Sequence, residues 1–195
     1  MTRRLVTNIA LSLDGHYQGP GGPHDMAWLM PYAISDVSRE HLTRLWEPAT
    51  TALLGRVNAE GFLGFWPTVL DMPEADERDR AYARWLVDAE KVVLSTTLTE
   101  APWERTRIVN APAADVADEL KAQDGGDIVV FASASVITAL LKADRVDRLA
   151  LTIFPTFTGG GPTIFPDGLP AAGWSLASAE HGDDGTVALM YDRAR

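Results

Sequence analysis

A glycine and an arginine at the end of an apolar run form the part of this chain best suited to bind an anion. The run from Ala52 to Leu54 has the composition of a buried strand, and it breaks at Gly55 and Arg56. We expect a short helix to restart at Asn58, because asparagine is a good N-cap residue. An arginine, free backbone N–H groups and the positive end of a helix would then meet, which favours a nucleotide phosphate. A tight turn with a solvated arginine explains the same residues, so both interpretations stay open.

Other apolar runs are also followed by small or hydroxyl residues. In an open α/β sheet, ligands bind at the carboxyl ends of the strands, so these positions are candidates for further parts of one site. Turns and helix caps need the same residue types, which is the alternative explanation. The segments are Asp14-Gly15, Ser95 to Thr97, Ala132 to Ser135 and Thr156 to Gly161.

Charge and composition argue against several classes of protein. The formal net charge of −10 disfavours nucleic acid as a partner, because duplex binding depends on Lys and Arg that neutralise phosphates. The chain has no cysteine, so it can form neither disulfides nor a thiolate metal site. His24, His41 and His181 lack the spacing of metal ligands, and we expect no metal.

Length and hydropathy favour one soluble domain. A chain of 195 residues, 46% of them hydrophobic, can bury a single sizeable core, so we expect one domain over residues 1–195. The longest uncharged run, Ile128 to Leu141, is too short to span a bilayer. Asn8, Ser12 and Asp14 interrupt the first apolar segment, which makes it a poor signal peptide. These features predict a cytoplasmic protein with no membrane partner.

Two hydrophobic periodicities alternate along the chain and indicate strands and helices in turn. Alternating or short apolar runs predict strands at Leu5–Leu13, Thr51–Leu54, Lys91–Leu94, Thr106–Val109, Ile128–Phe131, Leu149–Phe154, Trp174–Glu180 and Thr186–Arg193. Helical spacing predicts helices at Ser35–Trp46, in a stretch ending near Ala89, around Val116 and Leu120, and at Val136–Ala143.

The order of these elements predicts the fold class. The strand Ile128–Phe131, the helix Val136–Ala143 and the strand Leu149–Phe154 form a βαβ unit, which predicts parallel pairing and a right-handed crossover. The turn from Gly182 to Gly185 indicates a hairpin between the last two strands. We therefore expect a three-layer α/β fold with a mostly parallel central sheet and a C-terminal antiparallel hairpin.

Several motifs, taken in their order, resemble a known family. Over Arg3 to Arg193 the chain is similar to the dihydrofolate-reductase-like superfamily, and within it to the C-terminal reductase domain of the bifunctional riboflavin-biosynthesis deaminase-reductase. The deaminase half of that protein needs zinc-binding cysteines, which this chain lacks. The motifs are Ser12-Leu13-Asp14-Gly15, Leu54-Gly55-Arg56 before an alanine-glutamate helix, Val93 to Thr96, Ile128 to Ser135, and Leu149 to Phe154 with Gly159-Gly160-Gly161 and Phe165-Pro166.

The resemblance implies NADPH as the cofactor. Gly55 and Arg56 would lie against its phosphates, with Arg56 the candidate for the 2′-phosphate. Asn58 would cap the short helix there and could donate to phosphate. The helix N-terminus that follows would face the pyrophosphate, although the family usually has glycine where this chain has Ala132. The residues implied at that N-terminus are Ser133, Ala134, Ser135 and Val136, and those implied near the adenosine are Ser95 and Thr96.

The resemblance also implies hydride transfer to a small substrate. Asp14 matches an aspartate that contacts substrate in the family, although a turn residue before glycine is an equal alternative. Thr152 matches a threonine that borders the substrate pocket, and a buried strand threonine is the alternative. The segment from His16 to Tyr32 would be a mobile loop over the nicotinamide. A proton donor is not assigned; Asp25 and Glu40 are the carboxylates that could serve.

The substrate is the least determined part of the interpretation. His16 stands where riboflavin-pathway reductases place a lysine, which weakens the case for a phosphorylated substrate. Aromatic residues near the expected mouth suit a flat heterocycle, or equally a dimer interface or core packing. The leading hypothesis is an NADPH-dependent reductase of a pterin- or pyrimidine-like molecule, related to the riboflavin-pathway uracil reductase. A nucleotide-binding protein without turnover and a scaffold protein are the alternatives, and the resemblance implies a homodimer. The aromatic residues are Tyr17, Trp28, Tyr32, Phe65 and Trp66.

Overall fold

One mixed sheet runs through the computed structural model, which describes residues 3–23 and 25–194. Its strands are β1 (Leu5–Ser12), β2 (Ala49–Gly55), β3 (Glu90–Leu94), β4 (Thr106–Val109), β5 (Asp127–Phe131), β6 (Arg148–Phe154), β7 (Trp174–His181) and β8 (Val187–Arg193). Within the described residues their order is β4-β3-β2-β5-β1-β6-β8-β7. β1 to β6 pair in parallel, whereas β8 and β7 pair antiparallel at one edge. The predicted fold class is confirmed.

The pairing of β5 with β6 differs from the prediction. The two strands are parallel, but β1 lies between them and pairs with both. β1 can hold this central place because both of its faces are buried: Leu5 and Ile9 face one core and Val6 faces the other. A strand covered on both sides is the expected centre of a parallel sheet. The βαβ unit therefore encloses the first strand instead of closing on itself.

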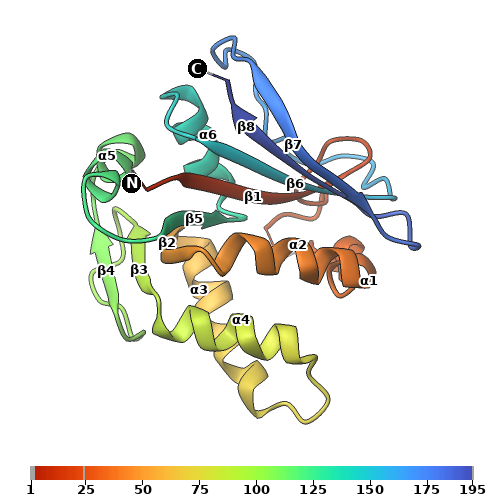
Figure 1. Ribbon diagram of the computed structural model, residues 1–195, viewed down its shortest axis with the longest axis horizontal. Coiled ribbons are helices and arrows are strands. Elements are labelled where there is room, and N and C mark those ends of the chain that lie inside the picture. Colours follow the sequence, from red (N-terminus) through yellow and green to blue (C-terminus); the bar gives the residue numbers. More distant parts are fainter. Residues whose placement is uncertain (1–2, 24, 195) are drawn as a thin grey trace.

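Helices cover both faces of the sheet (Figure 1). They are η1 (Ala27–Leu29), α1 (Met30–Ala33), α2 (Asp36–Trp46), α3 (Arg56–Phe65), η2 (Trp66–Asp71), α4 (Glu77–Asp88), α5 (Ala113–Lys121) and α6 (Ala134–Lys142). α2, α3 and α4 share one hydrophobic core with the sheet, and α5 and α6 share the other. The described residues contain no helix with the length and apolar character needed to cross a membrane.

Two helices begin earlier than the sequence indicated. α3 begins at Arg56 with Gly55 as its N-cap, so the prediction that Asn58 is the N-cap is wrong. Gly55 has the extended backbone of a cap residue (φ −80°, ψ 156°), which lets β2 pass into α3 without an intervening turn. Asn58 instead lies in the first turn of the helix. α6 likewise begins at Ala134, two residues before the predicted Val136.

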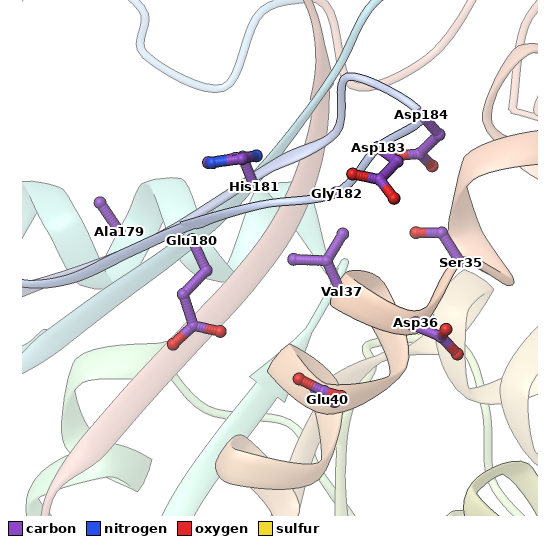
Figure 2. A pocket seen from close by; sticks show the side chains of 10 residues that line it. All are labelled: Ser35, Asp36, Val37, Glu40, Ala179, Glu180, His181, Gly182, Asp183 and Asp184. Atoms are coloured by element: carbon purple, nitrogen blue, oxygen red, sulfur yellow. The ribbon is translucent and has the colours of Figure 1, made fainter.

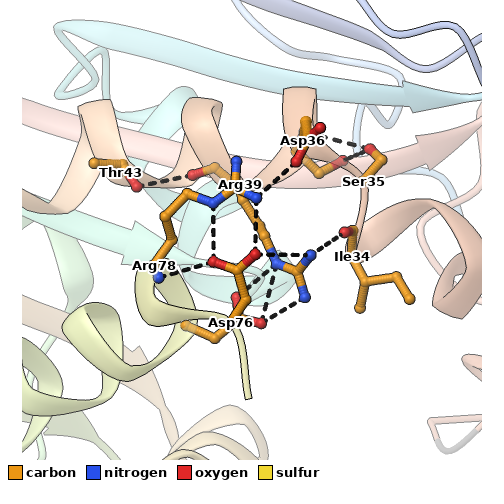
Figure 3. Close-up of polar contacts among 9 residues, drawn as sticks. Ile34, Ser35, Asp36, Arg39, Thr43, Asp76 and Arg78 are labelled. Carbon is orange, nitrogen blue, oxygen red and sulfur yellow. Dashed lines mark hydrogen bonds and ion pairs between the residues drawn. The ribbon is translucent and has the colours of Figure 1, made fainter. Parts of the chain in front are cut away.

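Ionic contacts fix α2 against α4 (Figure 3). The Arg39 guanidinium reaches the Asp79 carboxylate at 2.7 Å and the Asp76 carboxylate at 3.5 Å. Arg78 bridges Asp76 at 2.8 Å and Asp36 at 2.6 Å, and its hydrogen bonds hold the pKa of Asp76 well below its usual range. Because Arg39 also donates to the backbone oxygen of Ile34, the network holds the end of α1 as well. The start of α2 and the end of α1 are thus tied to α4 through charge-assisted contacts.

The segment His16–Tyr32 is more structured than the predicted loop. It contains η1 and the first residues of α1, while His24 lies outside the described residues. Tyr17 N donates to the Pro162 oxygen, and the Gln18 oxygen lies so close to Gly161 that a Cβ there would sit 2.1 Å from it. The segment therefore rests on the loop that follows β6. That it moves over a cofactor stays a prediction.

Candidate functional site

The carboxyl ends of β2 and β5 lie side by side, and we call this strand-end position, beside Gly55 and Ala132, the switch-point crevice. These strands are neighbours in the sheet, yet the helices that follow them go to opposite faces: α3 joins one core and α6 the other. A reversal of this kind is a topological switch point, the usual ligand-binding position of an open α/β sheet. α3 starts directly after β2, and α6 starts after a two-residue turn at the end of β5. The Gly55 N–H donates to the Ser133 hydroxyl, so the two N-termini lie beside each other at the crevice. Two positive helix ends at one point create a site for an anion.

One wall of the crevice is the part of β1 that extends beyond β5. The last partner of β1 on that side is Phe131, opposite Asn8, and Ala132 N donates to the Asn8 oxygen. β1 continues to Ser12 and is paired there with β6, up to Phe154. The β5 side of β1 therefore has no strand neighbour past Asn8 within the described residues. This open edge offers backbone hydrogen-bonding groups to a planar amide, in the manner of an added strand.

Arg56 lies at the rim of the crevice, in the first turn of α3. Its side chain is 43% exposed and forms an i,i+4 ion pair with Glu60 at 3.0 Å. Such an exposed pair stabilises a helix by only about 0.3–0.5 kcal/mol, so an incoming phosphate can readily compete for the guanidinium. Asn58 is half-buried two residues further along the same helix. Gly55, Arg56 and Asn58 thus lie at the start of α3, and their contact with a cofactor stays a prediction.

The turn between β5 and α6 supplies the opposite side of the crevice. Ala132 has a left-handed backbone, with φ +47°, a conformation that favours glycine. Ser133 and Val136 are buried, whereas Ala134 is half-buried and Ser135 is exposed. An interaction of this turn with a cofactor would therefore use backbone N–H groups and the Ser135 hydroxyl rather than the buried side chains.

Ser95 and Thr96 lie after β3, one strand further from the centre of the sheet. The Ser95 hydroxyl accepts from Thr97 N at 3.1 Å and from Leu98 N at 2.8 Å, so it closes a turn. Thr96 is exposed. β3 is next to β2, which puts these residues on the same edge as Arg56. Their predicted contact with the adenosine stays a prediction.

Asp14 is a fixed, ionised carboxylate at the end of β1. It accepts from the Ser12 hydroxyl at 2.5 Å, from Thr158 N at 3.2 Å and from Gly159 N at 2.9 Å. These bonds, the one from Ser12 foremost, lower the pKa of Asp14 to about 2. His16 Nε2 lies 3.8 Å from the same carboxylate. At neutral pH Asp14 can therefore accept hydrogen bonds and anchor the loop after β6, but it carries no proton to donate.

Thr152 lies near an aromatic corner on the α2 side of the sheet. It is 6% exposed, pairs with Ala10 and Ala188, and shares a sheet face with Phe154 by strand alternation. The rings of Trp28 and Tyr32 pack on Phe154, with centroid distances of 5.9 and 5.4 Å. The other predicted aromatics lie elsewhere. Tyr17 packs into the α5–α6 core, and Phe65 and Trp66 pack near Tyr82.

Sequence reasoning missed two buried polar atoms on the α2 side of the sheet. The Asn8 Oδ1 and Trp28 Nε1 atoms are buried and have no hydrogen-bond partner among the described residues. Asn8 is on the same face of β1 as Ala10, and Trp28 contacts Phe154. Each is a buried polar group whose hydrogen bond a polar ligand could supply. Only the burial of the two side chains marks them, and the sequence pattern carries no signal of it.

A hollow of about 670 Å³ lies between the start of α2 and the β7–β8 hairpin (Figure 2). Five of its ten lining residues are carboxylates, which disfavour an anionic ligand such as a nucleotide phosphate there. Glu40, one of the two predicted proton donors, faces this hollow. Asp25, the other, accepts from Gly21 N within its own loop. Among residues 3–23 and 25–194, acidic and histidine side chains form no group that could hold a metal ion. The lining carboxylates are Asp36, Glu40, Glu180, Asp183 and Asp184.

The sheet order and the likeness to solved structures give this molecule the dihydrofolate-reductase-like α/β fold. The chain is a member of the RibD C-terminal domain family, whose model matches residues 3–188. Membership confirms the resemblance read from the motifs and establishes a relationship to reductases.

Three relatives illustrate the similarity. The uncharacterized protein YyaP of Bacillus subtilis (strain 168) is 24% identical over 189 residues, which are 97% of this chain and 94% of that protein. A deaminase/5-amino-6-(5-phosphoribosylamino)uracil reductase from Thermotoga maritima is 15% identical with a TM-score of 0.67, over 99% of this chain and 57% of that one. Dihydrofolate reductase from Enterococcus faecalis, complexed with NADP(H), is 18% identical with a TM-score of 0.64, over 100% and 99% of the chains. At these identities the two structures establish a common fold.

Proposed function

We propose that the protein is an NADPH-dependent reductase of a small pterin- or pyrimidine-like heterocycle. The observation that carries the proposal is the crevice at which the N-termini of α3 and α6 meet beside the rim arginine, Arg56. Neither cap residue places a side chain on its own helix. Ala134 N donates to the Ala132 oxygen, so the N–H groups of α6 that we assign to an anion are those of Ser135 and Val136. Family membership and the NADP(H) complex of the Enterococcus reductase support the same choice of cofactor.

The residues present fit a dinucleotide. Arg56 would bind the 2′-phosphate, and the first turn of α6, from Ala134 to Val136, would receive the pyrophosphate through its backbone. The open edge of β1 past Asn8 would hold the carboxamide of the nicotinamide ring. When bound, that ring supplies the hydride. The chain's own part is to orient the two rings and to exclude water, for which Trp28 and Tyr32 are placed.

The substrate would lie in the corner formed by Thr152, Phe154 and the two rings packed on it. Phe154, Trp28 and Tyr32 suit a flat heterocycle. A ring nitrogen or carbonyl could accept from Trp28 Nε1, and an exocyclic amine could donate to Asn8 Oδ1. We propose Thr152 and the Asp14 loop as the borders of this pocket. His16, in the place of the family's lysine, favours a substrate without phosphate.

Titration with NADPH and NADH tests the cofactor assignment. We expect Arg56→Ala to weaken NADPH binding about 10- to 100-fold, because a hydrogen bond to a charged group contributes about 1.5–3 kcal/mol. NADH, without the 2′-phosphate, should lose much less. Arg44→Ala is the matched control, since Arg44 is a similarly exposed arginine (45%) paired with Glu180 on another part of the surface. Absence of NADPH binding at millimolar concentration contradicts the proposal.

A hydride-transfer assay with pterins, folates and diaminopyrimidines then separates a reductase from a nucleotide-binding protein without turnover. A protein that binds NADPH but oxidises it with none of these compounds favours the second function. The homodimer implied by the resemblance is checked by light scattering of the purified chain, with and without NADPH.

A further inference from the structure

Ser133 makes an unusual use of its hydroxyl group. As the N-cap of α6 it would ordinarily accept a hydrogen bond from its own helix, but it forms no such cap. The side chain is only 3% exposed and is turned into the sheet. Its hydroxyl accepts from Gly55 N at 3.0 Å and donates to the Phe131 oxygen at 3.1 Å. One side chain thus links the cap residue of α6 to the cap residue of α3.

The reason lies in the way β5 ends. In the parallel register Ala52 is opposite Val129, so Gly55 would come opposite Ala132. The left-handed turn at Ala132 ends the strand there and leaves the Gly55 N–H without a partner in the ladder. The Ser133 hydroxyl replaces the missing strand carbonyl. Gly55 lies so close that a Cβ there would sit 3.8 Å from the Ser133 Cβ.

We propose that Ser133 is a positioning residue that holds the N-termini of α3 and α6 at the spacing needed for one dinucleotide to contact both. This inference rests on the proposed function. Because the hydroxyl is used between the helices, it does not compete with the ligand for the N–H groups of Ser135 and Val136. Without it, Gly55 and the start of α3 lose their only side-chain hydrogen bond to the α6 turn within the described residues.

Ser133→Ala tests the inference, with Thr138→Val as the matched control. Thr138 lies on the same helix, and its hydroxyl donates to the Ile164 oxygen at 3.2 Å, so the control also removes one structural hydroxyl. NADP⁺ affinity is measured by calorimetry at a temperature where each variant is fully folded. We expect Ser133→Ala to weaken NADP⁺ binding about tenfold, and Thr138→Val to change it less than twofold.

A second ligand separates positioning from a general loss of structure. Adenosine 2′-monophosphate carries the phosphate for Arg56 but no pyrophosphate, so its affinity should fall much less than that of NADP⁺ in Ser133→Ala. Ser133→Cys, whose thiol is a weak acceptor, should give an intermediate NADP⁺ affinity, and it serves as the test if the alanine variant does not fold.

The outcomes distinguish the inference from the function on which it rests. Wild-type binding of NADP⁺ with equal binding by Ser133→Ala, or equal losses in Ser133→Ala and Thr138→Val, overturns the positioning role alone. Wild-type protein that binds neither NADPH nor NADP⁺ overturns the proposed function, and the positioning role with it.

Discussion

Ala132 occupies a backbone conformation that suits glycine, and we predict that Ala132→Gly stabilises the protein. The residue has φ +47° in the turn between β5 and α6. In the left-handed region the alanine Cβ crowds the following carbonyl oxygen, a strain that glycine does not have. The turn is fixed on both sides, by the bond from Ala132 N to the Asn8 oxygen and by the buried Ser133, so it cannot relax to a negative φ.

The magnitude follows from two opposing effects. A left-handed conformation costs an ordinary residue about 1–2 kcal/mol. Glycine loses about 0.5–1 kcal/mol more conformational entropy than alanine on folding. The difference predicts a gain of about 0.5–1 kcal/mol in the free energy of unfolding. For a domain of 150–250 residues, 1 kcal/mol corresponds to about 2–4 °C, so Tm should rise by about 1–4 °C.

Urea unfolding and thermal unfolding measure the effect, with Ala139→Gly as the control. Ala139 is exposed in the middle of α6, where glycine costs about 1 kcal/mol, so the two variants should shift stability in opposite directions. If Ala132→Gly destabilises the protein as Ala139→Gly does, the strain argument is wrong. Removal of the methyl group should also raise NADP⁺ affinity, because Ala132 borders the crevice. Unchanged affinity with raised stability would place the ligand away from this turn.

Two further predictions concern the loop after β6 and a buried histidine. Gly161→Ala should lower the free energy of unfolding by about 1–3 kcal/mol or more, because φ is +119° and the new Cβ would sit 2.1 Å from the Gln18 oxygen. Gly168→Ala is the control for backbone strain alone, because Gly168 has φ +85° and open space around it. Equal losses of stability for the two variants in urea unfolding would refute the close approach. Burial, and to a lesser degree Arg44, lowers the pKa of His41 to about 4, so the folded protein keeps it neutral while the unfolded chain binds a proton below about 6.5. The free energy of unfolding should therefore fall by up to about 3 kcal/mol as the pH drops from 6.5 toward 4. His41→Leu should remove that part of the dependence of stability on pH. An unchanged dependence in the variant would contradict the lowered pKa of His41.

The sequence predicted the layers of this fold because burial dictates them. The alternating apolar residues of β1 mark it as a strand of the buried sheet, and the C-terminal hairpin is marked by the turn from Gly182 to Gly185. The insertion of β1 between β5 and β6 was not predictable in the same way, because strand order depends on which faces fit together in space. Hydrophobic periodicity specifies a strand and its faces but not its neighbours.

The site shows the same division. Gly55 and Arg56 were found from sequence because a strand end followed by a cation has a local signal. The start of α3 was misplaced because Asn58 is a good cap by residue type, while the extended backbone of Gly55 determines the actual cap. The hydroxyl bridge from Ser133 joins residues far apart in the chain, and the unpaired Asn8 Oδ1 is defined by burial alone. Long-range contacts of this kind leave no periodic pattern.

The α3–α6 side and the β6 side of the crevice differ in which substitutions the fold tolerates. On the side of α3 and α6 the groups offered to an anion are mainly backbone N–H groups, which depend on helix starts and tolerate most side chains. On the side of β6 the corner is built from Trp28, Tyr32 and Phe154, so each substitution alters the shape that a ligand meets. Cofactor use should therefore follow from the fold, whereas the substrate should follow from a few side chains. A substrate screen is best guided by the aromatic corner and by the two unpaired atoms beside it.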